Sequence, residues 1–293
     1  MTSVSEWLSA ARPRTLPAAI SPVVIGTGVA FTLHHFLWWK ALLALLVSVA
    51  LQVGVNYAND YSDGIRGTDA NRVGPMRLVG SGAATAGSVK LAAFGCFAVS
   101  AAGGLALAAT SGWWLLIPGA LAIAAGWFYT GGPKPYGYAG FGELFVFVFF
   151  GLFAVNGTTY VQAGRITYGS VAFSIGIGLM ACALLVANNL RDIVTDTETG
   201  KRTLAVLVGD ALSRRIYALM VAGALLAAVV VGLRHPWVLL GLLTLPLAAV
   251  PVRAVLRGAR GPKLISVLVN TGRLEFSYSV LVALGMIFSR LTI

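Results

Sequence analysis

Charged residues are scarce in this chain. Of its 293 residues, 10 are Asp or Glu and 21 are Lys or Arg, so 11% of the chain is charged while 58% is hydrophobic. About a quarter of the residues of a typical water-soluble domain are charged. The composition therefore excludes an ordinary soluble domain and predicts an integral membrane protein.

Cysteine and histidine are also nearly missing. The two cysteines, Cys96 and Cys182, fall inside apolar stretches, which favours packing roles over a disulfide or a metal pair. The three histidines, His34, His35 and His235, are all predicted on the outer face of the membrane, which argues against a histidine base. No segment has the glycine and lysine spacing of a phosphate-binding P-loop.

What the chain does have is a series of long apolar stretches. We count nine, at about 16–34, 40–59, 88–110, 112–130, 141–162, 169–190, 215–233, 237–256 and 274–290. Each is close to the roughly 20 residues that cross a hydrocarbon core about 30 Å thick. The sequence therefore predicts an all-α, polytopic membrane protein in which residues 1–293 form one domain of about nine transmembrane helices.

The positions of the charges predict the topology. With the N-terminus in the cytoplasm, seventeen Lys and Arg lie on the cytoplasmic side against four outside, as the positive-inside rule expects. The same arrangement places all ten acidic residues on the cytoplasmic side and the C-terminus outside. Glu6, Arg12 and Arg14 precede the first stretch without a small-residue cleavage site, so no cleavable signal peptide is expected in this multi-pass cell membrane protein.

Half of the acidic residues are gathered in two segments. The first acidic segment (residues 56–69) carries Asn56, Asn59, Asp60, Asp63 and Asp69, and the second acidic segment (residues 188–196) carries Asn188, Asn189, Arg191, Asp192 and Asp196. Asn188 and Asp192 each lie 132 residues after Asn56 and Asp60, which predicts two pseudo-repeated halves with one acidic segment each.

Carboxylates gathered beside a membrane repel one another and are costly to desolvate, unless a cation compensates them. Oxygen ligands without histidine or thiolate favour Mg²⁺, which is usually shared between carboxylates and substrate phosphates. The predicted metal ligands are Asp60, Asp63, Asp69, Asp192 and Asp196. The alternative is that these acids form only a solvated network with nearby Arg and Lys. Asp210 is expected to cap a helix instead.

Basic and amide side chains near the two segments can bind an anionic substrate such as a diphosphate. The predicted substrate-binding residues are Asn56, Asn59, Arg66, Arg72, Arg77, Asn188, Asn189, Lys201, Arg202, Tyr61 and Tyr160. The predicted catalytic residues, beyond Asp60, Asp63, Asp192 and Asp196, are Lys134, Arg191, Tyr129 and Tyr138.

The two acidic segments, together with residues 129–138 and 200–206, resemble the UbiA superfamily of intramembrane aromatic prenyltransferases. The resemblance covers essentially the whole chain. Residues 59–69 and 191–204 are similar to the branch of that superfamily that acts in menaquinone biosynthesis. In the more general family form a third acid follows the second by four residues, whereas Asp69 follows Asp63 by six, and this leaves the role of Asp69 in metal binding open.

The resemblance implies nine helices around a central cavity, in which two Mg²⁺ ions bridge the acidic segments through a polyprenyl diphosphate. It also implies a reaction: the prenyl chain is transferred to 1,4-dihydroxy-2-naphthoate, and diphosphate and CO₂ are lost. Tyr61, Tyr129, Tyr138 and Tyr160 are candidates to shelter an allylic cation with their rings. Phe145, Phe149 and Phe153 are candidates to line the path of the apolar tail.

Two other functions stay open. A prenyltransferase of the same superfamily with another acceptor, such as homogentisate, 4-hydroxybenzoate or a sugar phosphate, would share the site and differ only in the pocket. An anion or lipid-phosphate transporter would place its site near the middle of the bilayer. The ionisable residues of this chain gather on one face, which favours the enzyme.

Overall fold

The computed structural model describes residues 2–67 and 76–291, and within them the chain is helical, with no strand. The first half contains α1 (Val4–Ala10), η1 (Pro13–Thr15), α2 (Pro17–Thr32), α3 (Trp38–Ile65), α4 (Ala86–Ser111), η2 (Trp113–Leu115), α5 (Leu116–Phe128) and η3 (Tyr136–Tyr138). The second contains α6 (Gly142–Val146), the π-helical η4 (Phe147–Phe153), α7 (Ala154–Ala163), α8 (Tyr168–Arg191), α9 (Ile193–Glu198), α10 (Leu204–Val208), α11 (Asp210–Gly232), η5 (Pro236–Thr244), α12 (Leu245–Leu256) and α13 (Lys263–Leu291).

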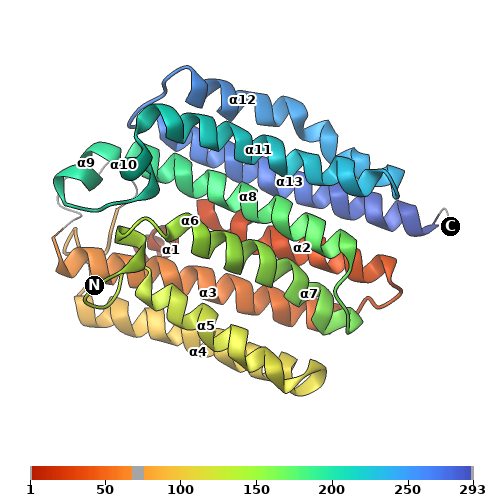
Figure 1. The fold of residues 1–293 in the computed structure, drawn as a ribbon. Coiled ribbons are helices and arrows are strands. Elements are labelled where there is room, and N and C mark those ends of the chain that lie inside the picture. Colours follow the sequence, from red (N-terminus) through yellow and green to blue (C-terminus); the bar gives the residue numbers. More distant parts are fainter. Residues whose placement is uncertain (1, 68–75, 292–293) are drawn as a thin grey trace.

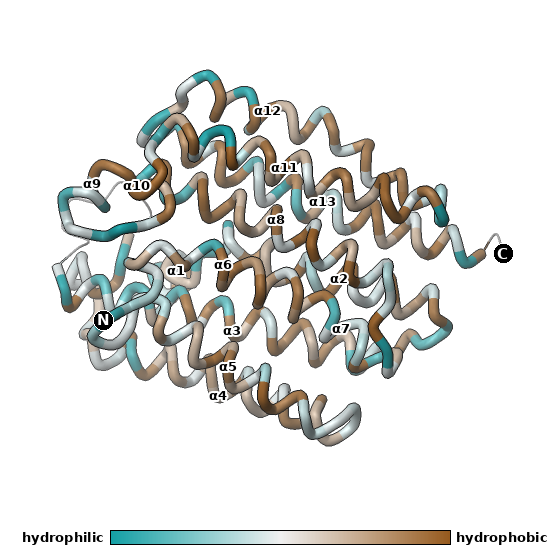
Figure 2. Tube along the Cα trace, in the orientation of Figure 1, coloured by the Kyte–Doolittle hydropathy of each residue, from teal (hydrophilic) through white to brown (hydrophobic). Residues whose placement is uncertain are grey.

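The long helices lie side by side and run between two ends of the molecule (Figure 1). The N-terminus, α9 and α10 lie at one end and the C-terminus lies at the other. Hydrophobic residues fill the middle of the bundle, while hydrophilic residues gather toward its ends (Figure 2). This distribution is the one that a bilayer requires, because the hydrocarbon core excludes charge.

Seven helices of the described chain are long and apolar enough to cross a membrane, which confirms a multi-pass membrane protein. An eighth crossing results if the bent pair Val4–Thr15 and Pro17–Thr32, which meet at 53°, is counted as one span. The helix at Trp113–Phe128 is apolar but shorter. Every predicted apolar stretch thus corresponds to a helix, and nine crossings are consistent with this arrangement.

Two helices are longer than the apolar pattern predicts. α3 continues to Ile65, so Asp60 and Asp63 lie within the helix and not after it. α13 begins at Lys263, well before the predicted start at 274, and contains Glu275. Its buried residues recur at helical spacing from its first turn onward, so the polar residues between them do not end it. Residues 257–273 lie between the predicted apolar stretches 237–256 and 274–290, and α13 covers most of that range.

α8 runs through the core and packs on α11, α13 and η4. Glycines bring its neighbours unusually close: a Cβ atom on Gly151 of η4 would lie only 2.5 Å from the Ser174 carbonyl oxygen of α8. Small residues at such contacts are typical of helices that associate within a membrane. The close packing holds α8, which leads to the second acidic segment, against the other helices of the bundle.

Candidate active site

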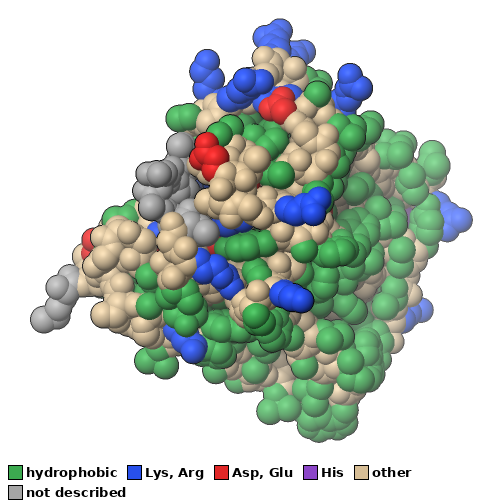
Figure 3. Space-filling view, turned by 60° about the vertical axis from the view of Figure 1, so that its left-hand side comes forward, with side chains coloured by type: hydrophobic (Ala, Val, Ile, Leu, Met, Phe, Trp, Pro, Cys, Tyr) green, Lys and Arg blue, Asp and Glu red, His purple; other side chains and the backbone are tan. Residues whose placement is uncertain are grey.

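A cavity of about 710 Å³ lies at the end of the bundle that carries the N-terminus. Many of the predicted site residues line it, namely Asn56, Asn59, Asp63, Arg77, Tyr129, Tyr138, Asn188, Asn189, Arg191, Asp192, Asp196 and Lys201. Phe145 and Phe149 extend the wall with apolar surface. Figure 3 turns this end toward the viewer and shows Lys and Arg side chains around it, above flanks of hydrophobic side chains.

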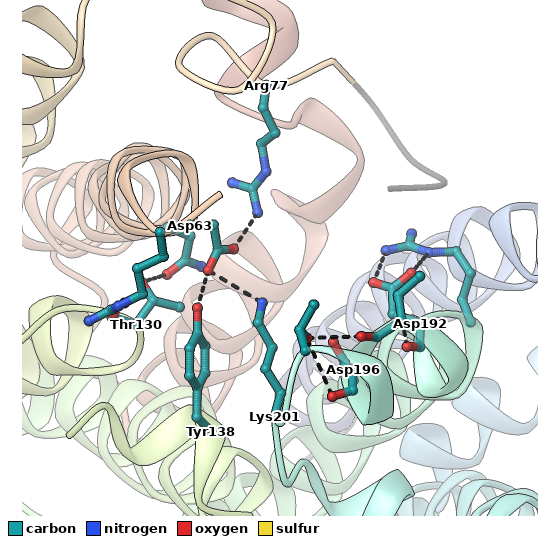
Figure 4. Close-up of polar contacts among 12 residues, drawn as sticks. Asp63, Arg77, Thr130, Tyr138, Asp192, Asp196 and Lys201 are labelled. Atoms are coloured by element: carbon teal, nitrogen blue, oxygen red, sulfur yellow. Dashed lines mark hydrogen bonds and ion pairs between the residues drawn. The ribbon is translucent and has the colours of Figure 1, made fainter. Parts of the chain in front are cut away.

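Asp63 is the centre of a polar cluster in this cavity (Figure 4). Its carboxylate accepts a hydrogen bond from the Tyr138 hydroxyl, and it forms ion pairs with Arg77 (Nη2 to Oδ2, 3.2 Å) and Lys201 (Nζ to Oδ1, 3.4 Å). Lys201 Nζ also lies 4.5 Å from the centre of the Tyr138 ring. These partners come from three segments far apart in sequence, so Asp63, which is only 4% exposed, ties them to α3.

Asp60 has a different environment from Asp63. It is fully buried, and its two carboxylate oxygens accept hydrogen bonds from the backbone N–H groups of Leu78 (2.8 Å) and Val79 (3.0 Å). It does not line the cavity. Asp60 therefore holds the segment after residue 75 against α3 and so positions Arg77 beside Asp63.

The second acidic segment turns at the end of α8. Asp192 follows the last residue of that helix and forms a two-pronged ion pair with its neighbour Arg191 (Nε to Oδ1, 2.7 Å; Nη2 to Oδ2, 2.6 Å). Asp196, on α9, donates its backbone N–H to the Asp192 carbonyl oxygen (2.8 Å), so the two residues are one helical turn apart. Lys201 lies between Asp63 and Asp196, so the two acidic segments face the same space (Figure 4).

Several predicted residues lie elsewhere. Arg66 donates hydrogen bonds to the Thr130 and Gly132 carbonyl oxygens, and Tyr61 stacks on Trp127 at 6.0 Å. Lys134 and Arg202 have exposed side chains and do not line the cavity.

Tyr160 and Phe153 do not line the cavity either, because α7 and η4 lead away from the end that contains it. Tyr160 accepts a hydrogen bond from Trp114 (3.2 Å) near the far end of α7, and Phe153 is 42% exposed. Asp69 and Arg72 lie outside the described residues.

The N-terminal segment, which no sequence pattern assigned to the site, forms part of the cavity wall through Arg12, Arg14 and Thr15. Asn56 donates hydrogen bonds to the Ala11 carbonyl oxygen (2.9 Å) and to Thr15 Oγ1 (3.1 Å), which fixes this segment on α3. The available signal is the run Arg12-Pro13-Arg14 before the first apolar stretch, which by itself indicates only topology.

The donor set suits a hard cation. Asp63, Asp192 and Asp196 offer carboxylate oxygens to the cavity, and its described lining contains no cysteine or histidine. Among the described residues, no three acidic, histidine or cysteine side chains already form a metal-binding group. Mg²⁺ keeps several waters and commonly completes its octahedron with substrate phosphates, so it needs only one or two carboxylates from a protein. The residues present therefore fit Mg²⁺ bound together with a phosphate.

Tyr129 offers the cavity a neutral hydroxyl and a ring face. Burial raises the pKa of its phenol above the ordinary range, and the nearby carboxylate of Glu143 raises this pKa further. Burial raises the pKa of Tyr136 in the same direction. Both phenols therefore stay protonated at neutral pH, and neither is prepared to act as a base.

A membrane-embedded helical bundle in which two acidic segments and several cations face one partly apolar cavity is suited to a substrate with a diphosphate head and an apolar tail. The chain belongs to the UbiA prenyltransferase family, whose model matches residues 19–271. It is 53% identical over 292 residues to the 1,4-dihydroxy-2-naphthoate octaprenyltransferase of Mycobacterium tuberculosis, with 100% of both chains covered. It is 36% identical to the enzyme of the same name from Escherichia coli, with 99% of this chain and 97% of the relative covered.

Solved structures of the family share the fold. A UbiA homolog from Archaeoglobus fulgidus superimposes with a TM-score of 0.66 at 15% identity and covers 98% of this chain and 100% of its own. A structure of that homolog bound to GPP and Mg²⁺ has the same TM-score at 14% identity, over 94% of this chain and 99% of the other. The predicted UbiA-like, all-α fold is therefore confirmed.

Proposed function

We propose that the protein transfers a polyprenyl chain from a polyprenyl diphosphate to 1,4-dihydroxy-2-naphthoate, with loss of diphosphate and CO₂, and so makes the quinol form of demethylmenaquinone. The observation that carries this proposal is the 53% identity, over the whole chain, to an enzyme named for that acceptor. The cavity supports it independently, because its polar residues suit a diphosphate and its aromatic wall suits a prenyl chain.

The reaction needs a stabilised leaving group. The bond between the first prenyl carbon and the diphosphate oxygen breaks, and its electron pair leaves with the diphosphate. Arg77, Arg191 and Lys201 line the cavity and would bind the negative charge as it develops. Arg12 and Arg14 add two further cations to the same wall.

We assign the metal to Asp63, Asp192 and Asp196, with two Mg²⁺ ions expected, one at each acidic segment. When bound, Mg²⁺ supplies further neutralisation of the diphosphate. Asp60 contributes by holding Leu78 and Val79, and hence Arg77, in place. Asp69, the remaining predicted ligand, lies outside the described residues.

The aromatic residues have separate tasks. Tyr129 and Tyr138 present their rings at the polar end of the cavity, where an allylic cation would form. The rings of Phe145 and Tyr136 stack with their centres 4.0 Å apart, and the ring centre of Phe149 lies 6.1 Å from that of Phe145. These rings form an aromatic wall that leads away from the polar end. The naphthoate carbon that bears the carboxylate attacks the prenyl cation. The bond to the carboxylate then breaks, CO₂ leaves, and its electron pair restores the aromatic ring.

We place the cavity on the cytoplasmic side, with the N-terminus cytoplasmic and the C-terminus outside. The distribution of Lys and Arg supports this orientation. Thr197 and Arg165 are both exposed and lie at the two predicted faces. In a chain without Cys96 and Cys182, a cysteine at 197 should react only with reagent on the cytoplasmic side and one at 165 only with reagent outside. Labelling of both from one side would contradict this orientation.

The function is tested by product analysis. Purified protein receives Mg²⁺, a mixture of prenyl diphosphates and several aromatic acids, and the lipid products are identified by mass spectrometry. Prenylated naphthohydroquinone with release of CO₂ is expected from dihydroxynaphthoate, and no product from 4-hydroxybenzoate. Equal turnover of both acids would support a broader acceptor range, and the absence of any diphosphate release would favour a transporter.

A further inference from the structure

A buried carboxylate stands directly behind the cavity wall. Glu143, in the first turn of α6, is 7% exposed and does not line the cavity. Its Oε1 accepts a hydrogen bond from Nδ2 of Asn189 (2.9 Å), and Asn189 does line the cavity. The backbone carbonyl of Glu143 accepts a hydrogen bond from the Cys182 thiol (3.1 Å), so α6 is joined to α8 at two levels.

The local sequence allows this close approach. Gly142 precedes Glu143, and a Cβ atom at Gly142 would lie 3.3 Å from both Leu185 of α8 and the ring of Tyr129. A larger residue would push α6 away from α8, because such a contact is tighter than ordinary packing. Glycine thus lets the Glu143 carboxylate reach Asn189.

The contact fixes which atom of Asn189 faces the substrate. In the structure the amide nitrogen of Asn189 donates to Glu143 Oε1, so the carbonyl oxygen lies on the other side of the amide group. No described residue donates a hydrogen bond to that oxygen. It is also not one of the fully buried polar atoms that lack a hydrogen-bond partner, so it is open to the cavity. Asn189 therefore presents a hydrogen-bond acceptor to the cavity.

An acceptor does not suit the diphosphate, whose oxygens are themselves acceptors. It does suit a phenolic hydroxyl, which donates. We propose that Glu143 is a positioning residue for the aromatic substrate: it holds the Asn189 amide so that the carbonyl oxygen accepts a hydrogen bond from a ring hydroxyl. This inference rests on the proposed function, because it requires a hydroxylated aromatic acceptor. The same hydrogen bond stabilises positive charge that develops on that hydroxyl as the ring attacks.

The test is a comparison of Michaelis constants in purified variants. Glu143→Leu should raise the KM for dihydroxynaphthoate about five- to tenfold, the loss expected for one misdirected hydrogen bond, with the KM for prenyl diphosphate changed less than about twofold. Glu143→Gln keeps a carbonyl oxygen that can accept from Asn189, so it should stay within about twofold of the wild type. Asn189→Ala should raise the acceptor KM as Glu143→Leu does.

The double variant separates positioning from a general structural effect. If Glu143 acts through Asn189, Glu143→Leu should have little further effect on the acceptor KM in the Asn189→Ala background. Glu275→Leu is the matched control, since Glu275 is another buried carboxyl group that neither lines the cavity nor bonds to Asn189. It should leave the acceptor KM unchanged.

Three results would overturn the inference. These are an unchanged acceptor KM in Asn189→Ala, multiplicative losses in the double variant, or an increased Mg²⁺ requirement in place of the increased acceptor KM. If Glu143→Leu fails to fold, Glu143→Met, which also removes the acceptor oxygens, takes its place in the single and double comparisons. Wild-type turnover is measured in the same assay, so a wild type without product would contradict the proposed function, whereas an active wild type with insensitive variants would contradict only the role of Glu143.

Discussion

The two acidic segments look equivalent in sequence and are built differently in space. Asn56 and Asp60 match Asn188 and Asp192 at a constant offset of 132 residues. Yet Asp60 lies inside α3 and binds two backbone N–H groups, whereas Asp192 lies beyond the last residue of α8 and pairs with Arg191. Only Asp192 of this matched pair lines the cavity.

The difference shows how one acidic pattern can serve two purposes. In the first acidic segment, Asp60 supports the segment at Leu78 and Val79, whereas Asp63, one turn later, faces the cavity and contacts Tyr138, Arg77 and Lys201. In the second, both Asp192 and Asp196 face the cavity. The comparison therefore predicts that Asp60 can be distinguished from the other three acids by experiment.

Removal of divalent metal should have the largest effect, because it acts on both segments at once. Exhaustive chelation is expected to lower the rate by more than about 10³-fold, since the diphosphate leaving group loses its main source of neutralisation. Excess Mg²⁺ should restore the rate, which controls for damage by the chelator. Turnover that survives chelation would remove metal from the mechanism.

Replacement of a cavity-facing acid should come next. Asp63→Asn and Asp196→Asn keep the side-chain shape but remove a charge, and each is expected to lower the rate at saturating substrate by about 10²-fold or more. Each should also raise the Mg²⁺ concentration that gives half the maximal rate. Rates are compared after confirming that both variants remain folded in detergent. A normal Mg²⁺ requirement in both would contradict the assignment.

Asp60→Asn should have a smaller and different effect. An asparagine can accept from only one of the two N–H groups of Leu78 and Val79, and an unmet buried group costs about 1–3 kcal/mol. We expect a lower melting temperature and a loss of activity of about tenfold as Arg77 becomes less well held, a loss of the size typical for one general positioning contact. The Mg²⁺ requirement should stay normal. A shifted requirement would place Asp60 with the metal ligands after all.

Asp210→Asn should have the smallest effect. Asp210 is the first residue of α11 and forms a part-buried ion pair with Arg214 (Nε to Oδ1, 2.7 Å), one turn later. Neither residue lines the cavity, so loss of the pair should affect stability and change activity less than twofold. The sequence predicted a helix cap here, but Gly209 precedes the helix and Asp210 lies within its first turn. A large loss of activity in this variant would show that the acids important for the reaction extend beyond the two segments.

The membrane fold and the two acidic segments could be predicted because both depend on patterns along the chain. Long apolar stretches must cross a bilayer as helices, and clustered carboxylates in so apolar a sequence require a cation. Asp63, Asp192 and Asp196 were accordingly predicted as site residues, and the structure brings them to one cavity.

The roles of individual side chains depend on contacts between distant segments, which no local pattern reveals. Asp60 does not face the cavity because its carboxylate accepts hydrogen bonds from the backbone of residues 78 and 79. Arg66 does not line it because its guanidinium donates to the carbonyl oxygens of Thr130 and Gly132. Tyr160 lies near the end of α7 that is far from the cavity, although a tyrosine ring is able to stabilise an allylic cation. The N-terminal segment is held on the cavity wall by hydrogen bonds from Asn56 and Gln52 of α3.

The central claim is that the two acidic segments form one diphosphate site, and a double-mutant cycle tests it most directly. The affinity for prenyl diphosphate in the presence of Mg²⁺ is measured for wild type, Asp63→Asn, Asp196→Asn and the double variant. Since residues that share a ligand couple, the combined loss should be smaller than the product of the two single losses by about fivefold or more. A combined loss equal to that product, as distant independent sites give, would contradict the claim.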